Sequence, residues 1–160
     1  MSASLFVHSG EKNEKYQALL QQIPGLLDPQ VDVIANMANV AAALRETFGF
    51  FWVGFYRVVG EQLVLGPYQG PLACTRIAFG KGVCGASWEQ QKTLVVANVH
   101  EFPGHIACSE ASKSEIVVPI MVDGQVVAVL DIDSDEFATF DDIDRESLEK
   151  ICTCLSELYP

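Results

Sequence analysis

The sequence lacks an excess of basic charge, a long apolar run and a leader-like beginning. Lys and Arg number 10 against 21 Asp and Glu, which gives a formal net charge of −11. This composition cannot easily supply the basic face that binds a phosphate backbone, so a nucleic-acid partner is not expected. No apolar run approaches the ~20 residues that span a bilayer, and residues 1–15 have neither the basic start nor the apolar stretch of a signal peptide. We therefore expect a cytoplasmic protein with no membrane partner.

The five cysteines form an odd-numbered set in a chain with no predicted export signal. In a reducing compartment such residues are more often catalytic, redox-active or metal-binding than structural staples, although free cysteine also fills cores. Cys74, Cys84 and Cys108 fall at predicted turns and loops, off any regular apolar face. Cys152 and Cys154 lie two apart on a predicted helix, so their side chains diverge and we expect a structural role.

Cys84 follows the glycine-rich run GKGV and precedes a predicted short helix. We expect it near the helix N-terminus, where the helix dipole favours a thiolate. Carboxyl groups close to a cysteine act in the opposite direction, because their negative charge raises the thiol pKa. The protonation state of a loop cysteine therefore depends on which of these influences is stronger.

Apolar periodicity predicts helices at both ends of the chain and strands between them. The first helix spans 11–23 and stops before Pro24, and the second begins at Asp28 as its N-cap and ends at Gly49. Strands are expected at 50–58, 61–68, 75–79 and 93–99 and in a hairpin that turns at Asp123-Gly124, with helices at 87–91 and from 141.

This order predicts an α+β fold in which a central antiparallel sheet carries helices mainly on one face. The sequence has no internal repeat and no linker, so we expect a single domain over 1–160. Within it, 1–49 supplies the N-terminal helices, 50–140 the sheet and the candidate active-site loops, and 141–160 the C-terminal helix. The two leading helices are amphipathic, and one of them is free in this scheme to pack on a partner subunit.

Residues 98–113, NVHEFPGHIACSEASK, are long, polar and rich in special residues for a simple connection. Loops of this length in compact domains are usually functional or mobile. His105 and Cys108 in this loop have H-x-x-C spacing, with His100 and Cys84 available elsewhere, but a structural zinc site normally shows two compact ligand pairs. The sequence therefore predicts no metal site.

Carboxylates occur where strands are predicted. Asp131 and Asp133 alternate in VLDIDS and so share one face of their strand. If the turn at Asp123-Gly124 pairs its strands directly, Glu115 lies near Asp131 across the ladder. Acidic side chains that point inward from a sheet are costly unless they meet a partner. The alternative is that they lie on a solvated face or at a strand end.

Trp52 and Tyr56 lie four residues apart on the first predicted strand and therefore on the same face. For aromatic residues in strands, core packing is the common role. The alternative is an aromatic wall for a small ligand with a soft or cationic part.

Four runs of residues carry a closer identification: WVGFY, ACTRIAFGKGVCG, TLVVANVHEFPGHIACSEASKSEIVVPI and VLDIDS. Together they resemble the free methionine-(R)-sulfoxide reductases, enzymes built on a GAF domain. The resemblance is specific, because cysteines spaced ten and then twenty-four apart accompany a PGHIAC loop and a SEIVVP strand. It covers nearly the whole chain. It implies a GAF fold, a homodimer and reduction of free L-methionine (R)-sulfoxide, a product of oxidative stress.

The same resemblance implies roles for the cysteines. Cys108 corresponds to the cysteine that attacks the sulfoxide. Cys74 and Cys84 correspond to the resolving cysteines, with Cys74 the first choice for the principal disulfide to Cys108 and Cys84 the second. No cofactor is implied beyond an external dithiol such as thioredoxin, which reduces the disulfide by exchange.

The resemblance also implies a substrate site. Glu115, Asp131 and Asp133 correspond to the acids that hold the substrate ammonium and handle the proton, and Glu115 is the candidate proton donor. Trp52 and Tyr56 correspond to the aromatic residues around the substrate methyl group. Closely spaced acids cannot all ionise, so at least one should keep its proton near neutral pH.

The alternatives to an enzyme are a GAF sensor that binds a cyclic nucleotide or another small ligand, and a redox sensor whose disulfide is itself the signal. Several acids beside the pocket make an anionic phosphate ligand unfavourable. A ligand sensor also has no need of reactive cysteines in its loops. The sequence therefore favours the reductase.

Overall fold

The structure is a computed structural model that describes residues 4–105 and 110–160. Along the chain come α1 (Lys12–Leu26), α2 (Val33–Phe48), β1 (Trp52–Val59), β2 (Gln62–Gln69), β3 (Arg76–Ala78), α3 (Gly82–Gln90), β4 (Leu94–Val96), the 3-10 turn η1 (Val99–Glu101), β5 (Ser114–Val122), β6 (Gln125–Ser134) and α4 (Asp142–Ser156). The predicted α+β order is confirmed. Within the two described stretches, no helix is long and apolar enough to cross a membrane.

One antiparallel sheet of six strands, in the order β3-β2-β1-β6-β5-β4, forms the centre of the molecule. The long hairpins β1–β2 and β5–β6 are joined by the β1–β6 pair, and the short strands β3 and β4 form the edges. Asp123 and Gly124 have φ values of 51° and 77°. Positive φ at both central residues is what a two-residue hairpin turn of this kind requires, so the predicted turn is confirmed.

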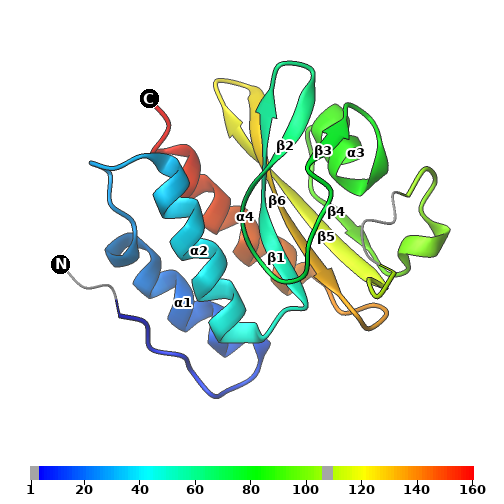
Figure 1. Cartoon of the computed structure of the whole chain (residues 1–160). Helices are drawn as coiled ribbons and strands as arrows, with labels where there is room; N and C mark the ends of the chain where they lie inside the picture. The colour runs from blue at the N-terminus through cyan, green and yellow to red at the C-terminus, as the bar shows by residue number, and fades with distance from the viewer. Residues whose placement is uncertain (1–3, 106–109) are drawn as a thin grey trace.

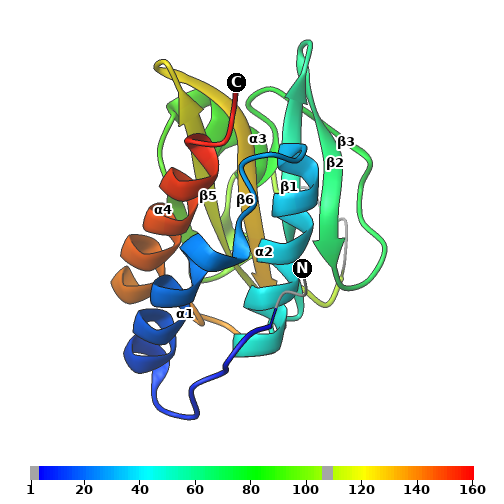
Figure 2. The same cartoon turned by 90° about the vertical axis from the view of Figure 1, so that its left-hand side faces the viewer.

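The helices divide unequally between the two faces of the sheet. Figures 1 and 2 show α1, α2 and α4 together on one face and α3 on the other. Strand alternation explains the helix-side core, because residues two apart on a strand point to the same face. That core holds Val53 and Phe55 of β1, Ile116 of β5, and Leu130 and Ile132 of β6. The opposite face of the same strands is left to form a site.

The predicted N-cap of the second helix, Asp28, is wrong. The helix begins four residues later, where the Asp32 side chain accepts a hydrogen bond from the Ile34 backbone N–H at 2.8 Å. Asp28 instead lies in a turn, held by two hydrogen bonds of 2.8 Å between its backbone and the Asn36 side chain. The predicted end is confirmed, because Gly49 caps the helix with φ of 67°.

Two other helix boundaries differ from the prediction. The first helix continues through Pro24 to Leu26 instead of stopping before the proline. Pro24 cannot donate a backbone hydrogen bond, but it lies in the last turn, which the Leu27 N–H closes by bonding to the Ile23 carbonyl at 3.1 Å. The short helix begins at Gly82 rather than at residue 87, because Gly85 lets it approach β3 closely. A Cβ at Gly85 would lie 2.6 Å from the Ala78 carbonyl oxygen.

Candidate active site

The candidate site lies on the sheet face that α3 covers, and three neighbouring strands supply its residues. The register places Trp52 of β1 opposite Asp133 of β6, and Asp133 opposite Glu115 of β5. Asp131 lies two residues before Asp133 and therefore points to the same face. Tyr56 is on this face too, and Cys84 of α3 packs against it. The structure thus brings these six predicted residues to one place.

The pairing of the acids differs by one step from the prediction. Glu115 is directly opposite Asp133, and Asp131 is opposite Val117. The predicted register assumed a regular hairpin, whereas β5 and β6 shift by one residue between Ile120 and Met121. A regular hairpin would pair Glu115 with Ile132, whereas the bulge pairs it with Asp133 and so puts it on the face of the β6 acids. Glu115 and Asp131 still lie close, with ligand atoms within 4.8 Å.

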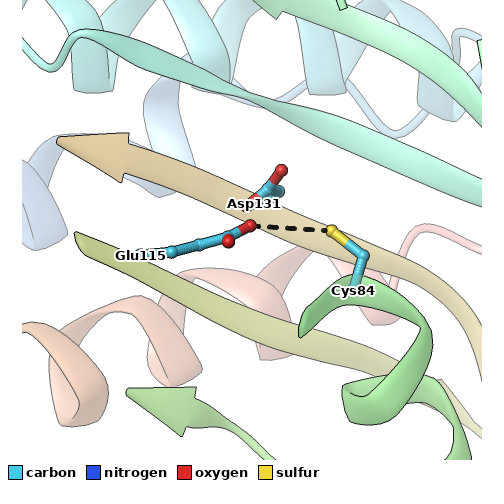
Figure 3. A group of neighbouring side chains, drawn as sticks. All are labelled: Cys84, Glu115 and Asp131. Atoms are coloured by element: carbon cyan, nitrogen blue, oxygen red, sulfur yellow. Dashed lines mark hydrogen bonds between the residues drawn. The ribbon is translucent and has the colours of Figure 1, made fainter. Parts of the chain in front are cut away.

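The acids are buried, which is unusual for this residue type. Glu115 is 7% exposed and Asp131 is 5% exposed, while Asp133 is partly buried. The Cys84 thiol donates a long hydrogen bond to Glu115 Oε2, with Sγ and Oε2 4.0 Å apart (Figure 3). One oxygen of Asp131, Oδ1, is buried and has no hydrogen-bond partner in the described part of the chain.

The aromatic residues form a wall beside the acids. Trp52 and Tyr56 stack with ring centroids 6.0 Å apart, and Tyr68 of β2 stacks on the other side of Trp52 at 5.1 Å. Gly54 makes this arrangement possible, because a Cβ there would lie 2.8 Å from the Trp52 ring and 2.3 Å from the Tyr68 Cβ. Sequence reasoning found Trp52 and Tyr56 but missed Tyr68, since cross-strand stacking depends on the register of β1 and β2.

The aromatic wall is also tied to the segment that carries Cys74. Trp52 Nε1 donates to the Pro71 carbonyl at 3.0 Å, and Tyr56 Oη donates to the Cys74 carbonyl at 2.9 Å. Leu72 and Ala73, between these two anchors, line the pocket. The position of Cys74 is therefore fixed by the same side chains that form the wall.

The cysteines fall into distinct environments. Cys74 is disulfide-bonded, whereas Cys84, Cys152 and Cys154 carry free thiols. Cys152 is buried in the helix-side core and Cys154 packs at its margin, positions in keeping with the structural role expected of them. Cys108 lies outside the described residues, so its predicted role as nucleophile stays a prediction.

A pocket of about 580 Å³, including the space at its mouth, joins these parts. Its lining comprises Phe51, Trp52, Tyr56, Leu72, Ala73, Ile77, Lys81, Gly82, Val83, Cys84, His105, Ser112, Glu115, Asp131 and Asp133. Sequence reasoning missed Lys81 and Ser112 as lining residues and considered His105 only as a metal ligand. Lys81 is distant from the acids in sequence, and only the tertiary fold places it at the pocket, whereas Ser112 lies just before the strand that carries Glu115.

Burial governs the electrostatics of the pocket. It raises the pKa of Glu115 well above its usual value, and the charge of Asp131 adds to the effect. Burial likewise raises the pKa of Asp133 well above the usual range, and the charge of Asp131 is the second cause. Burial also raises the pKa of Asp131 itself. Each shift favours the uncharged carboxyl group. At least one of the acids therefore keeps its proton near neutral pH.

Of the two opposing influences on Cys84, burial and the acids outweigh the helix dipole. Cys84 is in the first turn of α3, as predicted, but burial raises the pKa of its thiol well above the usual range, followed by the charges of Asp131 and Glu115. The helix N-terminus supplies about half a unit charge, whereas the thiol is desolvated and lies beside several acids. Cys84 is consequently a neutral thiol.

Among the described residues, no ion pair offsets the charge of these acids. The ion pairs there involve Lys12 and Arg145, and neither contacts Glu115, Asp131 or Asp133. Buried acids without a cationic partner are costly for the fold alone. The arrangement is suited to bind a compact positively charged group beside an aromatic wall.

Comparison with known proteins agrees with this geometry. Residues 32–156 match the GAF domain family. The chain is 55% identical to GAF domain-containing protein A of Dictyostelium discoideum, over 97% of the chain and 99% of that protein. It is 40% identical to the free methionine-R-sulfoxide reductase of Escherichia coli, over 92% and 90% respectively. The Neisseria meningitidis free methionine-R-sulfoxide reductase, solved in complex with its substrate, superposes with a TM-score of 0.94 at 47% identity and covers 97% of this chain and 94% of its own.

Proposed function

The chain belongs to the free methionine-R-sulfoxide reductases, oxidoreductases built on a GAF domain, and we propose that it reduces its substrate through Cys108 with the buried acids holding the substrate ammonium. The observation that carries this proposal is the set of Glu115, Asp131 and Asp133, which line one pocket with Trp52 and form no ion pair with any cation of the described residues.

The acids account for recognition of a free amino acid. A free methionine sulfoxide carries an α-ammonium, which a methionine sulfoxide inside a peptide lacks. At an effective dielectric constant near 20, one ammonium–carboxylate contact at 4 Å is worth about 4 kcal/mol before desolvation. The aromatic wall of Trp52 and Tyr56 is suited to contact the methyl sulfoxide end. The preference for the R isomer follows from family membership.

The reaction balances as two thiol steps. The Cys108 thiolate attacks the sulfoxide sulfur, the S=O bond breaks, and the oxygen passes with a proton to Cys108, leaving methionine and a cysteine sulfenic acid. A resolving thiol then attacks the sulfenic sulfur, forms a disulfide and releases water. Two thiols are oxidised for each sulfoxide reduced.

Glu115 is the proposed proton donor. A sulfoxide oxygen is a poor leaving group until it is protonated, so an acid near it is required. Burial and the charge of Asp131 raise the Glu115 pKa well above its usual value, which keeps a proton available near neutral pH. Asp131 and Asp133 remain to hold the ammonium.

Cys74 is the proposed principal resolving residue, with Cys108 as its partner, and Cys84 is the second choice. Two observations favour Cys74: it is disulfide-bonded, and its carbonyl is anchored by Tyr56 at the pocket. The buried Cys84 is a free thiol instead. Mapping the disulfide by mass spectrometry after one equivalent of substrate tests this choice. A Cys84–Cys108 bond as the first product would overturn it.

Recycling, assembly and location follow as further proposals from the family. Thioredoxin, an external dithiol, reduces the disulfide by exchange, so the electrons come from cysteines and no resident cofactor is needed. The protein acts in the cytoplasm as a homodimer and protects the free methionine pool during oxidative stress. Light scattering on the purified chain tests the dimer, and a monomer mass at assay concentration would contradict it.

The decisive experiment compares two serine variants with free methionine (R)-sulfoxide and a thioredoxin system. Cys108→Ser is expected to abolish turnover. Cys154→Ser removes a thiol on the helix side of the sheet, and it should retain wild-type turnover. Activity that survives in Cys108→Ser would contradict the mechanism.

A further inference from the structure

Cys84, Glu115 and Asp131 form a compact set of metal-ligating atoms. Their ligand atoms all lie within 4.8 Å of one another, and the three residues are 3%, 7% and 5% exposed. Figure 3 shows them converging from α3 and from strands β5 and β6. Each ligand is thus carried by a regular element, which holds the set more firmly than a loop would.

A second observation indicates that this set is incomplete without a ligand. Asp131 Oδ1 is buried and accepts no hydrogen bond from the described residues. The hydrogen bond between the Cys84 thiol and Glu115 spans 4.0 Å, which is long even for sulfur. A buried acceptor left in this state is costly for the fold, and a bound cation would remove that cost.

We propose that Cys84, Glu115 and Asp131 bind a divalent cation of the zinc class when substrate is absent. One sulfur and two carboxylate oxygens suit a borderline-soft ion such as Zn²⁺ and leave a fourth position for water. Ca²⁺ and Mg²⁺ prefer all-oxygen sites and are disfavoured by the thiol. On binding, the thiol and the protonated carboxyl group release their protons to solvent as the metal–ligand bonds form, so one thiolate and two carboxylates together offset the charge of the ion.

The cation and the substrate would compete for the same acids. Glu115 and Asp131 are the residues assigned above to the proton and to the ammonium, so zinc would act as a reversible inhibitor. This consequence rests on the proposed function, whereas metal binding itself does not. Separate measurements therefore test the two parts.

The binding test uses the full chain with its Cys74 disulfide intact and without thiol reductants, which chelate metals. Titration with Co²⁺ alone should give one equivalent bound with a thiolate-to-cobalt absorption band, and Zn²⁺ should displace it. Cys84→Ser is expected to lose the band and to weaken Zn²⁺ binding by at least about 100-fold. Cys154→Ser, which removes another free thiol, should change neither.

Asp131→Asn keeps this test independent of folding. It removes a ligand and also a buried unpaired charge, so it should weaken Zn²⁺ binding while the melting temperature holds or rises. A band that persists in Cys84→Ser would overturn the proposal. So would the absence of stoichiometric binding by the folded wild-type chain.

The competition test is a single turnover by pre-reduced, desalted protein, with methionine measured as product. Zn²⁺ should raise the substrate concentration needed for half-maximal rate without changing the limiting rate, and a chelator should reverse the effect. The residual turnover of Cys84→Ser should be insensitive to Zn²⁺. Stoichiometric binding without inhibition would overturn the shared site but not the metal site. A chain with no turnover in any condition would instead overturn the proposed function, and the cobalt band would still decide metal binding.

Discussion

Buried carboxyl groups occur on both sides of the sheet, and the two sides surround them differently. On the helix side, Asp144 is 1% exposed. It accepts hydrogen bonds from Lys12 Nζ and Tyr16 Oη, each at 2.6 Å, and from the Asp141 backbone N–H at 2.9 Å. A cation, a hydroxyl and an amide therefore satisfy a single carboxylate.

On the pocket side, Glu115, Asp131 and Asp133 lie together without a cation from the described residues. Their nearest polar neighbours are one another and a neutral thiol. The comparison teaches that a buried acid with complete partners serves the fold, whereas buried acids that lack partners indicate a ligand. Mutation of Asp144 or its partners should therefore lower stability, whereas mutation of Glu115, Asp131 or Asp133 should lower activity.

The largest expected effect is on turnover. Glu115→Gln should lower kcat by about 10²–10⁴-fold, the usual contribution of a general acid, and should leave the fold intact or more stable. Steady-state kinetics and thermal denaturation of the same preparation check both parts. If this variant kept wild-type kcat and lost only substrate affinity, Glu115 would not be the proton donor.

The converse variant is Asp144→Asn. Removing the charge leaves Lys12 with only its longer, 3.4 Å ion pair to the exposed Asp141, and the free energy of unfolding should fall by about 3 kcal/mol. The kcat/KM of the protein that remains folded should be unchanged, because the pocket is on the other face. Chemical denaturation gives the first quantity. A catalytic defect without loss of stability would break the comparison.

The pH dependence of stability should differ between wild type and Glu115→Gln. The folded pKa of Glu115 is raised above its usual 4.5, so the folded chain retains a proton that the unfolded chain has lost. The stability that this retained proton contributes is complete below the usual pKa of the unfolded chain. It is lost as the pH rises toward the higher pKa of the folded chain. Between these two pKa values, the free energy of unfolding falls by up to about 1.4 kcal/mol for each unit of rise in pH.

Urea denaturation of wild type and Glu115→Gln measures this difference. A range from about pH 4 to about pH 8 begins near the usual pKa of a carboxyl group and extends above it. The free energy of unfolding of the wild type should fall more steeply with rising pH than that of the variant. Parallel curves would mean that Glu115 titrates alike in the folded and unfolded chains.

The smallest effects should come from two tyrosine hydroxyls. Tyr16→Phe removes a bond to the Asp144 carboxylate and should lower the free energy of unfolding by about 2 kcal/mol. Tyr56→Phe removes a bond to the neutral Cys74 carbonyl and should cost about 1 kcal/mol. Denaturant titrations measure both. Equal losses would show that the charge of Asp144 adds nothing to its hydrogen bond.

The sequence predicted the fold and most of the pocket because both depend on short periodicities. Alternation in WVGFY and VLDIDS was enough to place Trp52, Tyr56, Asp131 and Asp133 on shared faces of their strands. The Asp123-Gly124 turn then brought Glu115 near Asp131. Position along a strand fixes the face, so these predictions needed no tertiary information.

The remaining features depend on tertiary contacts. Asp28 and Asp32 both suit an N-cap, and the choice follows from the Asn36 side chain that binds the Asp28 backbone. The neutral state of Cys84 depends on burial by α3 and on acids from two other strands. The bulge between Ile120 and Met121 shifts the register by one residue. Pro119, just before it, is a residue type found at bulges, but a proline alone does not say by how much the register shifts.

The central claim is that the unpartnered acids on the pocket side hold the substrate ammonium. The most direct measurement compares kcat/KM for free methionine (R)-sulfoxide with that for its N-acetyl derivative, which has the same sulfoxide but no ammonium. The account predicts a kcat/KM at least about 100-fold lower for the acetylated substrate, since 100-fold equals roughly 2.7 kcal/mol of lost charge interaction. Equal values for the two substrates would contradict it.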